Sequence, residues 1–272
     1  MSLLTCPICA APLEREGRTY RCPNRHCYDV AREGYVHLLP ANKKHSANPG
    51  DDKEMANART RFLDGGWYSP LREELCRLVL DHTGQSPAIL DAGCGEGYYT
   101  SGIFSTLNNA GKSPKLAGID LSKTALKKAA RRTPEGEFAV ASVYHLPVAE
   151  GAADLLLDCF APLALEEYRR VLKPGGVFLY VVPAAKHLME MKAVLYENPY
   201  ENQEENIAYD GFDYLDVVPV EALLHLGHDP LMDLFRMTPY TWKTPRDGVA
   251  RLDGLDGLDV TAAFRIHVFQ KR

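Results

Sequence analysis

The sequence has no long apolar run and no excess of basic residues. None of its apolar segments approaches the roughly 18 to 20 residues that cross a membrane as a helix. Residues 1–10 also lack the basic start and apolar core of a signal peptide. Internal repeats and low-complexity tracts are missing too. We therefore expect a cytoplasmic, globular protein, and 272 residues suffice for one large domain with a small appendage.

The charge is distributed unevenly along the chain. The net charge of −5 on its own disfavours a nucleic-acid partner. Residues 1–61, however, contain 10 Lys and Arg against 7 Asp and Glu, whereas the remainder contains 21 against 29. The distribution predicts that any contact with nucleic acid is made by the N-terminal end.

Four of the seven cysteines lie within the first 27 residues. They form two knuckles, Cys6-Pro-Ile-Cys9 and Cys22-Pro-Asn-Arg-His26-Cys27, and this spacing is typical of a structural tetrahedral zinc site. A short segment with so few aliphatic residues cannot bury enough surface to fold without a metal. His26 and Cys27 both remain candidates for the fourth ligand. The alternative is a metal-free hairpin with reduced cysteines.

The same segment interleaves arginine with tyrosine. This pattern suits phosphate contacts and base stacking on RNA. The alternative is a solvated arginine face with tyrosines that cover a small core. The residues concerned are Arg18, Arg21, Arg25 and Arg32, among Tyr20, Tyr28 and Tyr35.

Residues 88–100, Ala-Ile-Leu-Asp-Ala-Gly-Cys-Gly-Glu-Gly-Tyr-Tyr-Thr, predict a buried strand, a glycine turn and the start of a helix. Gly93, Gly95 and Gly97 let the backbone turn sharply and approach a ligand, because they carry no Cβ. A dinucleotide fingerprint needs its third glycine one residue later than Gly97. The turn therefore predicts a different cofactor.

Charge indicates which cofactor the turn binds. Asp91 and Glu96 would repel a pyrophosphate but attract a sulfonium or an ammonium group. Asp120 ends the next apolar run, where an acid can bind the two ribose hydroxyls of a cofactor. Together these motifs resemble the class I methyltransferases that use S-adenosylmethionine. A bound nucleotide or a purely structural turn is the alternative.

Alternating strands and helices beyond residue 88 predict an α/β, Rossmann-like doubly wound sheet. We expect Ser122 to cap a helix that ends at Arg132. The chain divides into a zinc-binding RNA-recognition module, a linker with a cofactor-covering segment, and the methyltransferase domain, at residues 1–40, 41–70 and 71–272. The expected strands are 89–90, 116–120, 137–141, 154–158, 177–182 and an antiparallel edge strand at 264–270, with a further strand within 217–226 left open. The other expected helices are 54–63, 71–81, 163–172, 186–195 and 229–237.

Nearly the whole chain resembles the bacterial large-subunit (23S) ribosomal RNA guanine-N1 methyltransferases. The resemblance implies a zinc module that helps to bind an rRNA hairpin, and a methyltransferase domain that modifies a guanine in its loop. It implies that Tyr68, Gly95, Glu96 and His187 contact S-adenosylmethionine. It also implies that Cys6, Cys9, Cys22 and His26 bind zinc, although Cys27 departs from the family motif. The motifs are residues 33–36, 38–40, 49–51, 62–70, 91–99, 161–162, 187–192, 237–239 and 266–267.

The end of the fourth predicted strand is where such folds present catalytic residues. Phe160 could stack on a guanine that has left its helix, and Asp158 could take the N1 proton. Alternatively, Asp158 accepts hydrogen bonds from nearby backbone and the proton passes to water. Two other functions stay open, a small-molecule methyltransferase acting for instance on quinones and a zinc RNA-binding protein without catalysis. The sequence leaves a monomer and a homodimer open.

Overall fold

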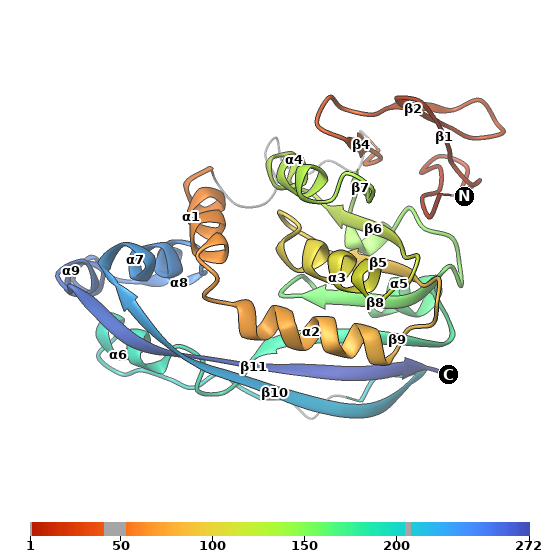
Figure 1. The fold of residues 1–272 in the computed structure, drawn as a ribbon. Coiled ribbons are helices and arrows are strands. Elements are labelled where there is room, and N and C mark those ends of the chain that lie inside the picture. Colours follow the sequence, from red (N-terminus) through yellow and green to blue (C-terminus); the bar gives the residue numbers. More distant parts are fainter. Residues whose placement is uncertain (1, 41–52, 205–207) are drawn as a thin grey trace.

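The computed structural model describes residues 2–40, 53–204 and 208–272, so residues 41–52 of the predicted linker lie outside the described residues. Within the described ranges, an eight-stranded sheet runs in the order β10-β11-β9-β8-β5-β6-β7-β4. The strands are β4 Tyr35–His37, β5 Ala88–Ala92, β6 Lys115–Asp120, β7 Glu137–Val140, β8 Ala153–Cys159, β9 Leu172–Pro183, β10 Phe212–Gly227 and β11 Gly257–Lys271. This arrangement confirms the predicted doubly wound α/β fold (Figure 1).

The central strands are parallel, and their carboxyl ends meet at one edge of the sheet. β5 pairs with β6 and β8, and β7 and β9 extend the parallel set on either side. Leu155, Leu156 and Leu157 of β8 are fully buried, as expected for a parallel strand covered on both faces. Ligands of such sheets bind at the carboxyl edge, so the site is expected there.

Helices cover both faces of the sheet. Ser122 caps α4 as predicted, because its Oγ accepts from the Ala125 amide at 3.2 Å. In the described part of the chain, every helix is too short or too polar to cross a bilayer. The helices are α1 Lys53–Asp64, α2 Ser69–Asp81, α3 Tyr98–Asn109, α4 Lys123–Arg132, the 3-10 turn η2 Val143–His145, α5 Leu165–Val171, α6 Met189–Leu195, α7 His228–Arg236, α8 Tyr240–Lys243 and α9 Arg246–Asp253.

The prediction of an edge strand at residues 264–270 was wrong. That segment belongs to β11, which begins at Gly257 and lies between β9 and β10. β10 forms the edge, and its 16 residues extend beyond the strand that the sequence had left open. Alternation of apolar and polar residues reports which faces are buried, but it carries no information about which strands are neighbours.

The N-terminal segment docks onto the other edge of the sheet. Strands β1 (Glu14–Glu16), β2 (Thr19–Arg21) and β3 (Cys27–Asp29) form a small antiparallel sheet, and β4 pairs in parallel with β7. The carboxylate of Glu137 accepts from the Leu3 amide at 2.8 Å and from the Tyr20 hydroxyl at 3.0 Å. Apolar residues of this segment share one core cluster with the main sheet.

Tyr20 of this segment is buried, so its ring is not available for base stacking, whereas Tyr28 is half-buried. Tyr20 is buried, and its hydroxyl bonds Glu137 of the main sheet. The hydroxyl of Tyr28 lies 3.0 Å from the sulfur of Cys6. The structure therefore agrees with the alternative in which tyrosines cover a small core, and it leaves the arginines on the surface.

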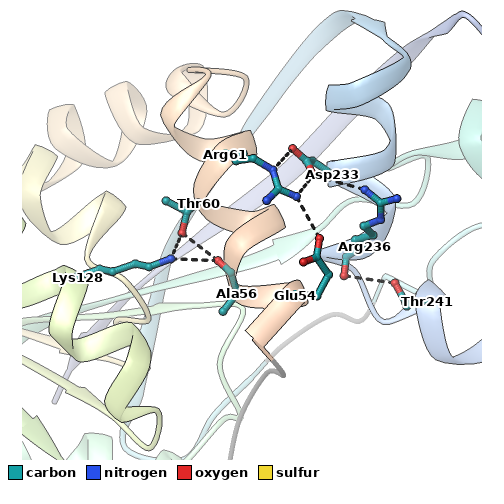
Figure 2. A network of polar contacts seen from close by, with 8 residues as sticks. All are labelled: Glu54, Ala56, Thr60, Arg61, Lys128, Asp233, Arg236 and Thr241. Carbon is teal, nitrogen blue, oxygen red and sulfur yellow. Dashed lines mark hydrogen bonds and ion pairs between the residues drawn. The ribbon is translucent and has the colours of Figure 1, made fainter.

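Helix α1 is fixed between α4 and α7 (Figure 2). On one side, Lys128 of α4 donates to the Thr60 hydroxyl and to the Ala56 carbonyl. On the other side, the Arg61 guanidinium donates to both oxygens of Asp233 at 2.9 and 2.6 Å. A two-pronged pair with a buried carboxylate has a defined geometry, so α1 is held in one orientation.

Candidate functional site

The glycine turn after β5 combines close packing with one open position. Gly93, Gly95 and Gly97 all have positive φ angles, of 84°, 54° and 76°. A Cβ on Gly93 would collide with the Ala161 Cβ, and one on Gly97 would lie 2.9 Å from Ala129. A Cβ on Gly95 would meet nothing within 4 Å. Gly93 and Gly97 thus make room for the protein itself, whereas Gly95 borders space that a ligand can enter.

Asp91 at the end of β5 carries an unsatisfied acceptor. One carboxylate oxygen accepts from the Thr100 hydroxyl, and Oδ1 is buried without a hydrogen-bond partner among the described residues. Burial raises the pKa of Asp91 to about 7, and the charges of Asp158 and Asp120 add to this shift. An ammonium group bound at Oδ1 would satisfy the acceptor and favour the charged carboxylate.

Asp120 at the end of β6 is held against the turn by backbone donors. Its two oxygens accept from the Gly95 amide at 2.9 Å and the Ser122 amide at 2.7 Å. Burial raises the pKa of this carboxyl, and these amide bonds oppose the shift. Each carboxylate oxygen retains a second lone pair, which is available to a ribose hydroxyl.

We expect Asp120→Ala to weaken binding of S-adenosylmethionine at least tenfold, because a hydrogen bond to a charged group contributes about 1.5 to 3 kcal/mol. Titration calorimetry measures the affinity. Asp154→Ala is the matched control, because Asp154 also accepts from a strand amide, that of Ala88, at 2.8 Å, but at the amino edge of the sheet. Unchanged affinity in folded Asp120→Ala, or an equal loss in the control, would contradict this role.

The side chain of Glu96 braces the turn rather than facing open space. One oxygen accepts from Thr60 of α1, and the other accepts from Arg132 of α4 at 2.7 Å. The sequence had suggested that the charge of Glu96 attracts the cofactor cation. Its contacts place the carboxylate between two helices, so it also secures α1 beside the glycine turn.

An aromatic cluster lies beside the carboxyl ends of β8 and β9, with Phe264 of β11 at its centre. The centroid of the Phe264 ring lies 4.9 Å from that of Tyr68, 4.7 Å from that of His187 and 5.5 Å from that of Phe160. Burial, together with the charge of Lys192, lowers the pKa of His187 to about 4, so its imidazole is neutral at pH 7. The cluster brings together three residues that the sequence had selected separately.

The β8–α5 loop presents Phe160 and buries Asp158. Asp158 is 0% exposed, and its oxygens accept from the Tyr168 hydroxyl at 2.8 Å and the Ala161 amide at 3.0 Å. Burial raises its pKa to about 7. Phe160 is 47% exposed and has a φ of 63°, an unusual value for a residue with a Cβ. The carboxylate thus holds the loop in the conformation that exposes the ring.

Four ligand groups of the N-terminal segment converge. The ligand atoms of Cys6, Cys9, Cys22 and His26 all lie within 4.8 Å of one another. The Cys9 and Cys22 sulfurs are 3.7 Å apart, and His26 Nδ1 lies 3.4 Å from the sulfurs of Cys6 and Cys22. Tetrahedral zinc with its usual bond lengths requires separations of about 3.8 Å between sulfurs and about 3.5 Å between sulfur and nitrogen. The four residues therefore fit one zinc ion.

Cys27 lies outside this cluster. Its side chain is exposed, and its sulfur lies 3.5 Å from the Arg25 carbonyl. Successive side chains of a strand point to opposite faces, and Cys27 begins β3 directly after His26. The backbone thus directs the histidine inward and the cysteine outward.

Sequence profiles match both parts of the chain. The profile described as "RlmA, N-terminal", a zinc ribbon, matches residues 4–47, and that of a methyltransferase domain matches residues 85–220. A 23S rRNA (guanine(748)-N(1))-methyltransferase of Streptomyces fradiae is 35% identical over 97% of this chain and 95% of its own length. The chain belongs to the family of 23S rRNA (guanine-N1)-methyltransferases. This chain is a methyltransferase that uses S-adenosylmethionine and carries an N-terminal zinc ribbon.

Further relatives agree with membership of the guanine-N1 methyltransferase family. A Bacillus subtilis protein that carries the same family name provisionally is 30% identical over 99% of this chain and 98% of its own length. A solved structure from Bacillus halodurans, described provisionally as a methyltransferase, covers 73% of this chain and 99% of its own at a TM-score of 0.50. Its identity of 13% supports the fold alone.

Several residues of this rRNA methyltransferase site had no signal in the sequence. Thr60 and Arg132 bind Glu96 from two different helices, and Phe264 joins the cluster from β11. Each is an ordinary residue type at its place in a helix or strand, so periodicity alone could not select it. Tyr99, by contrast, lies two residues after Gly97 and could have been considered with the turn.

Proposed function

We propose that this methyltransferase transfers a methyl group from S-adenosylmethionine to N1 of a guanine in a hairpin loop of 23S rRNA. The observation that carries the proposal is a likeness to guanine-N1 methyltransferases that spans zinc ribbon and methyltransferase domain together, over 97% of the chain. A small-molecule methyltransferase has no use for a zinc module that presents several exposed arginines. A ribosomal RNA substrate also supports a cytoplasmic location.

We assign a separate role to each of three segments of the chain. Residues 1–40 would form the zinc-binding RNA-recognition module, residues 41–70 would link it to the methyltransferase domain and cover the cofactor, and residues 71–272 would form the methyltransferase domain. The contact between Thr60 of α1 and Glu96 of the turn supports the covering role of the second segment. The pairing of β4 with β7 ties the module to the catalytic sheet.

Eight residues would form the cofactor site. When bound, S-adenosylmethionine supplies an activated methyl group on a sulfonium. Methyl transfer from such a group needs orientation more than acid or base chemistry. Asp91 would bind the ammonium group, Asp120 the ribose, and Gly95 leaves space for close approach. The full set is Tyr68, Asp91, Gly93, Gly95, Glu96, Gly97, Asp120 and His187.

Phe160 and Asp158 would act on the substrate side. The exposed ring of Phe160 can stack on a guanine that has left its helix. Asp158 would act through the loop, as a positioning residue for Phe160, because its carboxylate is fully buried and holds the loop through hydrogen bonds from Tyr168 and Ala161. The N1 proton then passes to water. Cys6, Cys9, Cys22 and His26 would hold zinc, which maintains the shape of the module and takes no part in the methyl transfer.

The test is methylation of ribosomal RNA from cells that lack the enzyme. With labelled S-adenosylmethionine, we expect one guanine of 23S rRNA to accept the label. N1 lies on the pairing edge of guanine, so its methylation should give a single reverse-transcription stop within a hairpin loop. RNA from cells with the enzyme is the control and should accept no further label. Label in a small molecule, or stops at many guanines, would refute the proposal.

A further inference from the structure

The cofactor turn is acidic, which poses a problem for one group of the proposed cofactor. Asp91, Glu96 and Asp120 all lie on or beside the glycine turn. They suit the ammonium and sulfonium groups of S-adenosylmethionine, but they repel the α-carboxylate of its methionyl part. That carboxylate needs hydrogen-bond donors and a cation nearby.

Tyr99 supplies a weakly engaged donor at this place. Its hydroxyl is buried without an oxygen or nitrogen partner among the residues that the structure describes, and its hydrogen-bonding neighbour is the Cys159 thiol, a weak acceptor. The electrostatic neighbours of this hydroxyl include Cys159, Tyr68 and Arg59. Cys159 is in turn a neighbour of Asp91, whose Oδ1 is the unsatisfied acceptor of the site. Cys159 is thus a neighbour both of a donor that has only this thiol as its partner and of a carboxylate with an unsatisfied acceptor.

Arg59 supplies the cation. It precedes Thr60 on α1, which bonds Glu96, and its guanidinium donates to the Met237 carbonyl at 3.2 Å. The negative charges that act on it include those of Glu96 and Asp120.

We propose that the Tyr99 hydroxyl and the Arg59 guanidinium bind the α-carboxylate of S-adenosylmethionine, while Asp91 Oδ1 accepts from its ammonium group. The zwitterionic end of the cofactor offers one acceptor group and one donor group. On the protein side, the Tyr99 hydroxyl is a donor, the Arg59 guanidinium is a cation, and Asp91 Oδ1 is an acceptor without a partner in the described residues. The inference rests on the proposed use of S-adenosylmethionine, and it adds two contacts from helices α3 and α1.

Binding of two probes to the full-length protein tests the assignment. S-adenosylhomocysteine carries both charged groups of the methionyl end, whereas its decarboxylated analogue keeps only the amine. Titration calorimetry should show Tyr99→Phe and Arg59→Gln binding S-adenosylhomocysteine about tenfold more weakly, as expected for loss of a hydrogen bond to a charged group. Both variants should bind the decarboxylated analogue with the affinity of the unmodified protein. Asp91→Asn should weaken binding of both probes.

Tyr98→Phe is the matched control, because the Tyr98 hydroxyl is also buried without a partner in the described residues. Its ring lies under Arg72, 4.5 Å from the guanidinium, so this variant should bind both probes normally. Thermal midpoints within about 2 °C would show that every variant is folded. Equal affinity of Tyr99→Phe and Arg59→Gln for S-adenosylhomocysteine, or equal losses for both probes, would overturn the assignment. Failure of the unmodified protein to bind S-adenosylhomocysteine would instead refute the proposed function.

Discussion

Replacing Cys22 with Ser should release the zinc ion and lower the thermal midpoint of the chain, whereas Cys27→Ser should change neither. Cys22 lies 3.7 Å from the Cys9 sulfur and 3.4 Å from His26 Nδ1, within the proposed ligand set. Structural zinc contributes on the order of 10 kcal/mol to the folding of small modules. The exposed Cys27 is a control of identical chemistry, because its sulfur faces away from the cluster.

Elemental analysis and calorimetric unfolding would measure both effects. One zinc per chain is expected in the unmodified protein and in Cys27→Ser, and much less than one in Cys22→Ser. Affinity for S-adenosylhomocysteine should persist below the lowered midpoint, because the cofactor residues lie on β5, β6 and their neighbours. Zinc lost from Cys27→Ser and retained in Cys22→Ser would show that the ligand set is wrong. Absence of zinc from the freshly purified unmodified protein would contradict the metal site itself.

The docking of the N-terminal segment determines how its part in RNA binding can be tested. Removing residues 1–40 would uncover the edge of β7 and part of a shared core, and would leave the Glu137 carboxylate without its partners. A truncated chain would then lose activity for reasons unrelated to RNA. Substitution of surface charges leaves these interactions intact, so it separates recognition from folding.

Replacing Arg21, Arg25 and Arg32 together with Gln should weaken rRNA binding on the order of 100-fold, if each removed charge contributes about 1 kcal/mol. All three side chains are exposed on the zinc module. The plot of log affinity against log salt should also become shallower by about 0.9 for each phosphate that is no longer neutralised, that is, by nearly 3. Affinity for S-adenosylhomocysteine should not change, because strands β1 and β2 of the zinc module lie apart from β5 and α3, which flank the glycine turn (Figure 1).

A second triple variant provides the matched control. Replacing Arg77, Lys115 and Arg272 with Gln removes the same number of positive charges, at exposed positions away from the zinc module. Filter binding across a salt series would measure both variants against the same 23S rRNA. If the control loses as much affinity as the module variant, net charge rather than a local footprint is responsible. An unchanged salt slope in the module variant would exclude these arginines as phosphate-binding residues.

The sequence by itself determined the features that depend on a few adjacent residues. The glycine turn could be located because positive φ angles favour glycine, and the observed angles of Gly93, Gly95 and Gly97 agree. The zinc knuckles could be located because two residues between cysteines set the reach of their side chains. The parallel sheet followed from apolar runs such as residues 155–157, which are buried on both faces.

Only the tertiary structure decided which distant segments meet. Periodicity does not encode neighbours, so it could not place β11 inside the sheet, join β4 to β7, or turn Tyr20 toward Glu137. The choice between His26 and Cys27 depended on the face of the backbone from which each side chain projects. Tyr99 and Arg59 lie 40 positions apart in the sequence, and only the packing of α1 beside the glycine turn brings them together. The donors and acceptors of the proposed cofactor site come from separate helices and strands. They can therefore match the groups of the cofactor only after the chain has folded.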